Sequence, residues 1–202
     1  MPWFNLMHIG DIELTSALAA AITVWLLATR AWRMAYWWSL LFTVGIGLVG
    51  ASKVASIAWG MTLHGLDFKA VSGHATGVTA VYPTLFYLLL RRRGAHGQAA
   101  GVAAGLILGA LMGVLLVVAN EHSLSEALAG WMTGAAVSLG AIRMAGALPP
   151  GRAGSHGLLC STLAFMSATW LMHAVPHGYL MFRTAAMLSR NLAPLAWGAA
   201  VN

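Results

Sequence analysis

Long stretches without charged residues alternate with short polar segments along the chain, and they predict helices that cross a membrane. Four stretches contain no Asp, Glu, Lys or Arg: residues 34–52, 70–90, 94–120 and 153–182. A helix needs about 20 apolar residues to cross a bilayer, and each stretch is close to that length or longer. Two shorter stretches, residues 14–29 and 127–142, have 16 residues each. They can still cross if Arg30 and Arg143 extend toward the lipid headgroups.

This pattern predicts an all-α integral membrane protein, a six-transmembrane helix bundle that forms a single domain over residues 1–202. The expected spans are residues 14–29, 34–63, 72–90, 98–120, 121–142 and 156–175. In the tail, residues 177–202, Arg183 and Arg190 stand seven positions apart on one helical face. We therefore expect the tail to form an amphipathic helix at the membrane surface.

The fourth predicted span carries a glycine at every fourth position: Gly101, Gly105, Gly109 and Gly113. Small residues on one helix face let a second backbone approach closely, which is a common way for helices to pack in lipid. The stripe predicts tight helix packing, either within one chain or between the chains of an oligomer.

Composition supports the membrane class and the charge distribution predicts an orientation. Charged residues make up 8% of the chain, against about 25% in soluble domains. Seven of the eleven basic residues fall in alternate loops: Arg30, Arg33, Arg91, Arg92, Arg93, Arg143 and Arg152. Such loops face the cytoplasm, so the net charge of +6 is explained without a nucleic acid. The Ala- and Gly-rich composition, with no signal-peptide pattern before Arg30, favours a bacterial inner membrane.

Lys53 stands inside the outer half of the second apolar stretch. A cation within a span is costly, so it is a candidate functional residue that needs an anionic partner. That partner could be a bound anion. The alternative is an ion pair with Glu121 or Glu126, or extension of the lysine toward water.

Ser72, Gly73 and His74 open the third predicted span. Serine is a favoured helix N-cap, and the free backbone N–H groups of a helix N-terminus suit a phosphate. Gly73 leaves room for an anion beside the backbone, and His74 could protonate a leaving oxygen. The simpler alternative is a serine cap followed by an interfacial histidine.

His122 and Glu126 are four residues apart at the start of the fifth predicted span. On a helix they would share one face. A carboxylate that accepts a hydrogen bond from one ring nitrogen leaves the other nitrogen free as a nucleophile. The simpler alternative is an ion pair on a helix surface.

Taken together, Lys53, Ser72-Gly73-His74 and His122-x-x-x-Glu126 resemble the motifs of the phosphatidic acid phosphatase type 2 superfamily, the membrane lipid phosphate phosphatases. That family's pattern is Lys-x6-Arg-Pro, Pro-Ser-Gly-His and Ser-Arg-x5-His-x3-Asp. The resemblance covers about residues 50–130. It implies that Lys53 and residues 72–74 bind phosphate, that His74 protonates the leaving alcohol, and that His122 forms a phosphohistidine while Glu126 orients it. It also implies a phosphorylated membrane lipid as substrate, an outward-facing, periplasmic active site, and a reaction without a metal or other cofactor.

The chain departs from the pattern at both family arginines. Gly60 and Leu116 stand where the arginines would be, Val71 replaces a proline, and Glu126 replaces an aspartate. Phosphoryl transfer depends on neutralising the charge of the transferring oxygens, and lysine does not reproduce the two-pronged contact of a guanidinium. Near the motifs, Lys69 could supply a second cation and Asn120 a hydrogen-bond donor.

Three functions are therefore compatible with the sequence. The first is a lipid phosphatase that acts on a phosphate monoester or a pyrophosphate. The second is a catalytically degenerate relative that binds a phospholipid or a partner without turnover, as the missing arginines suggest. The third is a haem or metal protein, because four of the eight histidines fall near outer helix ends: His64, His74, His122 and His173. Two facing histidines could ligate a haem.

Overall fold

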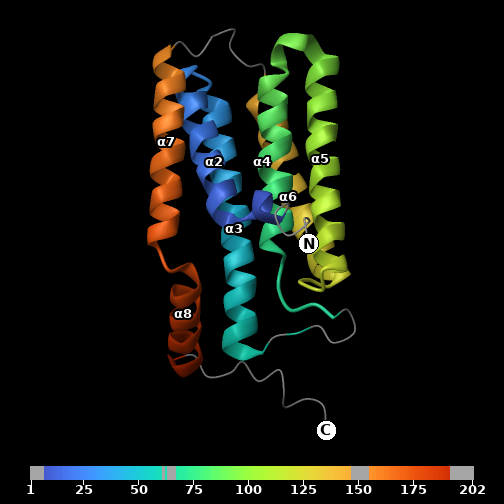
Figure 1. Cartoon of the computed structure of the whole chain (residues 1–202), viewed down its shortest axis with the longest axis vertical. Helices are drawn as coiled ribbons and strands as arrows, with labels where there is room; N and C mark the ends of the chain where they lie inside the picture. The colour runs from blue at the N-terminus through green and yellow to red at the C-terminus, as the bar shows by residue number, and fades with distance from the viewer. Residues whose placement is uncertain (1–6, 61, 63–66, 147–154, 192–202) are drawn as a thin grey trace.

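The structure, a computed structural model, describes residues 7–60, 62, 67–146 and 155–191, and its regular elements in those ranges are helices (Figure 1). The α-helices are α2 (Ile12–Ala28), α3 (Trp32–Trp59), α4 (Gly73–Leu89), α5 (Gly94–Val118), α6 (Leu124–Ala145), α7 (Ser155–Ala174) and α8 (His177–Asn191). Short 3-10 helices precede α2 and α5: η1 (His8–Gly10) and η3 (Arg91–Arg93).

Each of the helices α2 to α7 overlaps one of the six predicted spans. Within the described residues, three segments are long and apolar enough to cross a membrane by themselves: Trp32–Trp59, Arg91–Val118 and Ser155–Ala174. Helix α2 is apolar but shorter, with 17 residues. The protein is thus an all-helical membrane protein, and six crossings remain a prediction.

Helix α4 has 17 residues, too few for that criterion, and it is a central helix with polar side chains. Thr76, Thr79 and Thr84 are at most 1% exposed. The hydroxyl groups of Thr76 and Thr84 donate to the carbonyls of Ser72 and Ala80, one turn earlier. Such bonds let a helix carry hydroxyl groups inside a bundle, although the same residues lower its hydropathy.

Two helix boundaries differ from the prediction in ways that affect the candidate site. Helix α3 ends at Trp59 rather than at residue 63, because Gly60 has a φ of 62° and closes the helix in the left-handed conformation. Helix α6 begins at Leu124 rather than at residue 121, with Ser123 as its N-cap. His122 therefore lies in the turn before α6 and not on the helix.

The glycine stripe of α5 packs against α4, as predicted, and the contact is within one chain. A Cβ atom on Gly101 would lie 2.8 Å from the carbonyl oxygen of Phe86 in α4. A Cβ atom on Gly105 would overlap Pro83, which lies inside α4. The stripe therefore needs no second chain to explain it.

Helix α6 packs against another face of α4 through its own glycines. A Cβ atom on Gly130 would lie 2.6 Å from the carbonyl oxygen of Ser72, and one on Gly134 would lie 2.6 Å from that of Thr76. The hydroxyl of Thr76 also donates to the carbonyl of Gly130. Backbone therefore meets backbone, and the first turn of α4 is fixed next to the second and third turns of α6.

The predicted cytoplasmic and outer segments lie at opposite ends of the bundle. Figure 1 shows the α2–α3 turn and η3 at one end, and the end of α3, the start of α4 and the α5–α6 turn at the other. Arg30 and the three arginines of η3 thus share an end, whereas Arg152 lies outside the described residues.

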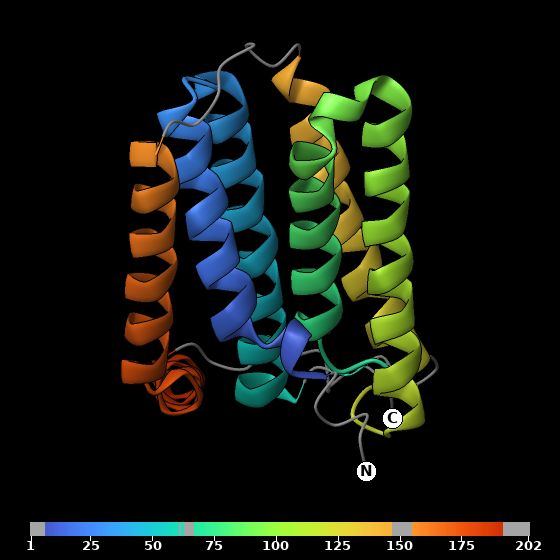
Figure 2. The same ribbon diagram turned by 45° about the horizontal axis from the view of Figure 1, so that its top comes forward.

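Helix α8 follows α7 but runs in a different direction, which is clear in Figure 2, where α8 is seen end-on. It packs against α3 and buries Ala185, while Arg183 and Arg190 are exposed. Tyr179 and Phe182 are also exposed, at 62% and 64%. A helix that exposes both basic and aromatic side chains fits the predicted position at a membrane surface. Residues 192–202 of the predicted tail lie outside the described residues.

The contact between α4 and α6 gives a test of stability. We expect Gly130→Ala to lower the unfolding temperature of the detergent-solubilised protein, because the added methyl group meets a backbone oxygen that cannot move aside. Overpacking of this kind costs about 1–3 kcal/mol. Gly47→Ala in α3 is the matched control, since no atom lies within 4 Å of its Cβ position. Equal unfolding temperatures for the two variants would contradict the proposed packing.

Candidate active site

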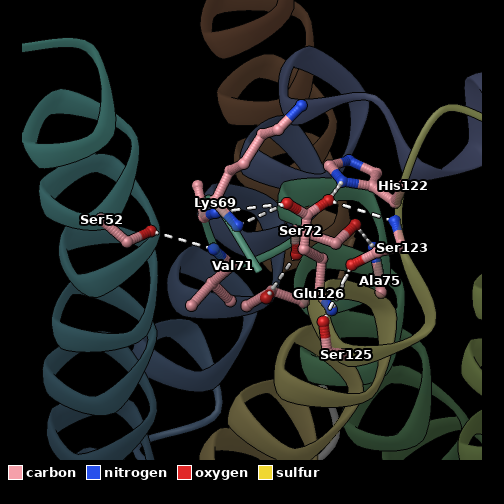
Figure 3. A network of polar contacts seen from close by, with 11 residues as sticks. Ser52, Lys69, Val71, Ser72, Ala75, His122, Ser123, Ser125 and Glu126 are labelled. Carbon is pink, nitrogen blue, oxygen red and sulfur yellow. Dashed lines mark hydrogen bonds and ion pairs between the residues drawn. The ribbon is translucent and has the colours of Figure 1, made fainter. Parts of the chain in front are cut away.

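The segment before α4 is held on both sides by side chains of neighbouring helices (Figure 3). On one side, the amide of Val71 donates to Ser52 Oγ of α3 at 3.1 Å. On the other, the amides of Lys69 and Ala70 donate to Glu126 Oε1 of α6 at 2.9 and 3.4 Å. These contacts fix where α4 begins relative to α3 and α6.

Glu126 is the centre of this polar cluster, and it is only 7% exposed. Its Oε2 atom lies 2.8 Å from Nδ1 of His122 and also accepts the amide of Ser123 at 3.2 Å. In return, Ser123 Oγ accepts the amide of Glu126, which completes a capping box at the start of α6. A buried carboxylate with this many donors is held in the ionised form that can accept a hydrogen bond from an imidazole.

The predicted pairing of His122 with Glu126 is thus present, but a shared helix face does not produce it. The turn between α5 and α6 brings the two residues together. The amides of Glu121 and His122 both donate to the carbonyl of Leu116, at 3.0 and 3.3 Å, and Asn120 has a left-handed φ of 57°. Because Glu126 is buried, the pair is not the exposed ion pair of the simpler alternative.

Ser72 is the N-cap of α4, as predicted. Its hydroxyl accepts the amide of Ala75 at 3.4 Å, and its own amide donates to the carbonyl of Glu126 at 3.2 Å. The first amides of a helix have no acceptor within the helix, so those of Gly73 and His74 are suited to an anion. A Cβ atom on Gly73 would lie 3.8 Å from Nζ of Lys53, which places a cation at the same helix end.

His74 points toward the N-terminal segment, where it meets a carboxylate that the sequence analysis did not single out. Its Nε2 atom lies 3.1 Å from Oδ1 of Asp11. The other oxygen of Asp11 lies 2.8 Å from Nδ1 of His8. Lys53 and His122 are also close enough to His74 to act on its charge.

The structure therefore gathers five of the predicted site residues at one end of the bundle: Lys53, Gly73, His74, His122 and Glu126. Ser72 supports them as the cap. Within the described residues, no ion pair joins Lys53 to Glu121 or Glu126, so that alternative for Lys53 is wrong.

Lys69 and Asn120, the two further candidates for phosphate binding, both have a role in the local structure. Lys69 contributes its backbone amide to Glu126, and its side chain is exposed. Asn120 is also exposed, and asparagine tolerates the left-handed conformation that follows α5. A role for either side chain in phosphate binding remains a prediction.

The departures from the family pattern also have local reasons. Gly60 adopts the left-handed conformation that ends α3. Leu116 is 1% exposed and packs with Ala75, Val78 and Met112 in a small apolar core. Val71 donates its amide to Ser52, a bond that the family's proline could not make.

Three of the four histidines that suggested a haem site each meet a carboxylate. His173 of α7 lies 3.2 Å from Glu13 of α2, in the same way that His74 meets Asp11 and His122 meets Glu126. His64 lies outside the described residues. These contacts orient the imidazoles, and they provide no observation in favour of haem.

Three side chains of the site were missed by reasoning from sequence: Asp11, Ser52 and Ser123. Ser123 could have been found, because Ser-x-x-Glu is the signature of a capping box. Asp11 and Ser52 are separated by 63 and 19 residues from the groups that they contact. No local pattern in the sequence marks contacts over such separations.

Comparisons with known proteins relate the central part of the chain to a known family. The family model described as the PAP2 superfamily matches residues 56–149. An "Uncharacterized 22.5 kDa protein in cps region" of Klebsiella pneumoniae is 35% identical over 139 residues, which cover 68% of this chain and 66% of that protein. No solved structure matches.

The region that matches the family model contains the start of α4 and the turn that carries His122, and the relative aligns with two thirds of the chain. The chain belongs to the PAP2 superfamily, the phosphatidic acid phosphatase type 2 superfamily, as a divergent member that lacks both motif arginines.

Proposed function

We propose that this protein is an integral membrane lipid phosphatase that hydrolyses a phosphate monoester or a pyrophosphate through a phosphohistidine at His122. The observation that carries the proposal is the 2.8 Å contact between His122 Nδ1 and the buried Glu126, next to the N-terminus of α4. We further propose that the site faces the periplasm of a bacterial inner membrane, since it lies at the end opposite the arginines of η3.

In the proposed first step, Glu126 accepts a hydrogen bond from His122 Nδ1–H, and the free Nε2 atom attacks phosphorus. The ester P–O bond breaks, and its electron pair stays on the leaving oxygen. His74 gives that oxygen a proton and becomes neutral. In the second step, water attacks phosphorus, and His74 takes up a proton from the water. The P–N bond breaks with its electron pair returning to Nε2 of His122, and inorganic phosphate leaves.

The charge of the transferring phosphate needs a positive environment. Lys53 supplies one cation, with Nζ next to Gly73. The unbonded amides at the start of α4 and the positive end of its helix dipole add to it. Lys69 is a further candidate cation, since its backbone is fixed next to the site.

A groove on the apolar surface supports a lipid substrate. It lies between α5 and α6 and has a volume of about 380 Å³. Val118 and Leu124 line it and flank the turn that carries His122, and Trp131 lines it further along α6. Indole Nε1 of Trp131 donates to the carbonyl of Leu106 at 3.0 Å and bridges the two helices. A hydrocarbon chain in this groove would have its polar end near the turn.

The second candidate function is binding of a lipid phosphate without turnover. The observation in its favour is that Leu116, at the place of a family arginine, is buried in an apolar core. Its main chain still positions His122, so the fold of the turn survives without the arginine. Only an assay of turnover separates the two functions.

We expect the purified protein to release inorganic phosphate from at least one member of a panel of lipid phosphates and lipid pyrophosphates in the presence of a chelator. His122→Ala should reduce the rate by at least about a thousandfold, because the nucleophile is lost. Saturable binding of the same lipids to both proteins, with no release by the parent, would instead establish the binding function.

Glu126→Gln tests whether the carboxylate orients the nucleophile. Glutamine keeps the size of the side chain but removes the charge that selects the His122 tautomer. We expect kcat to fall by about 10²- to 10⁴-fold with little change in KM. Glu121→Gln is the control, because Glu121 is exposed in the same turn and only its backbone amide has a contact there. A similar loss of kcat in both variants would refute this role.

Lys53→Met tests the cation at the start of α4. A hydrogen bond to a charged group contributes about 1.5–3 kcal/mol, so kcat/KM should fall by about 10- to 150-fold. Arg92→Gln is the control, since Arg92 is exposed at the opposite end of the bundle. An unchanged kcat/KM in Lys53→Met would show that Lys53 does not bind the substrate phosphate.

A further inference from the structure

Asp11 occupies a helix N-cap position but does not cap its own helix. It precedes α2, and its side chain makes no capping hydrogen bond, although aspartate is a favoured N-cap residue. Both carboxylate oxygens are directed instead at imidazoles. Oδ1 lies 3.1 Å from His74 Nε2, and Oδ2 lies 2.8 Å from His8 Nδ1. The carboxylate therefore serves a contact with α4 rather than the start of α2.

The backbone around Asp11 is fixed against the same turn of α4. A Cβ atom on Gly10 would lie 3.1 Å from Cβ of His74, so only a glycine fits there without a shift. The hydroxyl of Thr15 donates to the carbonyl of Asp11 at 2.9 Å. Thr15 in turn packs on Gly77, where an added Cβ would lie 2.8 Å from its Oγ1. Asp11 is thus held in place by the packing of α2 on α4.

His74 otherwise has cationic or neutral neighbours. The groups that act on its charge from other helices and turns are Lys53 of α3 and His122 before α6, together with Asp11. Lys53 opposes a positive charge on the imidazole. Asp11 supplies the negative charge that favours it, and the contact to Nε2 leaves Nδ1 as the nitrogen that can deliver a proton.

We propose that Asp11 is a positioning residue for His74, a role that rests on the proposed phosphatase function and that none of the three sequence motifs includes. Asp11 accepts the Nε2–H of His74 and so holds the ring with Nδ1–H directed at the leaving oxygen. When the P–O bond breaks, the Nδ1 proton moves to that oxygen, and Nε2 keeps its proton in the hydrogen bond to Asp11. In the second step, a proton from the attacking water returns to Nδ1.

The test uses two substrates that differ in their need for a proton. An alkyl lipid phosphate leaves as an alcohol and depends on the acid, whereas p-nitrophenyl phosphate has a leaving group that is stable as an anion. Because His74 also acts in the second step, which both substrates share, the rates are compared within the first turnover. We expect Asp11→Asn to slow alcohol release from the alkyl lipid phosphate at least tenfold and to leave release of p-nitrophenolate within about twofold. Equal losses on both substrates, or no loss on either, would overturn the proposal.

Glu13→Gln is the matched control. Glu13 also lies in the first turn of α2 and also contacts a histidine, but that histidine is His173 of α7. Both activities should stay within about twofold of the parent. Because p-nitrophenyl phosphate hydrolysis itself requires a folded site, a misfolded Asp11→Asn protein would lose both activities and would count against the proposal.

A double-mutant cycle separates positioning from independent effects. If Asp11 acts through His74, then adding Asp11→Asn to His74→Ala should change alkyl lipid phosphate hydrolysis by less than about twofold. Losses that multiply would show that Asp11 acts elsewhere. A parent that hydrolyses neither substrate would remove the proposed function and this inference together, whereas an active parent with an inactive His122→Ala isolates the failure to Asp11.

Discussion

The close approach of α4 to its neighbours is the constraint on which the rest of this structure depends. Gly130 and Gly134 let the backbone of α6 touch the carbonyls of Ser72 and Thr76, while the glycine stripe of α5 touches another part of α4. Because small residues provide packing where lipid offers no hydrophobic driving force, these contacts determine where α4 begins. The start of α4 then lies next to the turn that carries His122, and a polar site forms from groups far apart in sequence.

Two imidazoles of the site are each held by a carboxylate, but by different means. His122 is fixed to Glu126 through a capping box within about one turn of chain. His74 is fixed to Asp11 across 63 residues, through the packing of α2 on α4. In the proposed mechanism the first pair prepares a nucleophile and the second an acid. The positive environment comes from Lys53 and the start of α4, with glycine and leucine in the places of the family arginines.

The all-helical class, the approximate positions of helices α2 to α7, the serine cap and the packing role of the glycine stripe could be predicted, because they follow from local composition and spacing. The His122–Glu126 pair was also predicted, although for the wrong reason: a turn forms it, since α6 starts three residues later than expected. Asp11 and Ser52 could not be found in this way. Their roles follow from how α2 and α3 pack on the α4 region, which depends on complementary surfaces rather than on any periodic pattern.

The central claim is that His122 becomes covalently phosphorylated during turnover, and trapping that intermediate tests it most directly. The protein would be mixed with a lipid phosphate labelled in its phosphoryl group, quenched in alkali within the first turnover, and mapped by mass spectrometry. The account predicts a phosphoryl group on His122 in the parent and none in His122→Ala. Phosphate release without label on His122, or label on another residue, would contradict it.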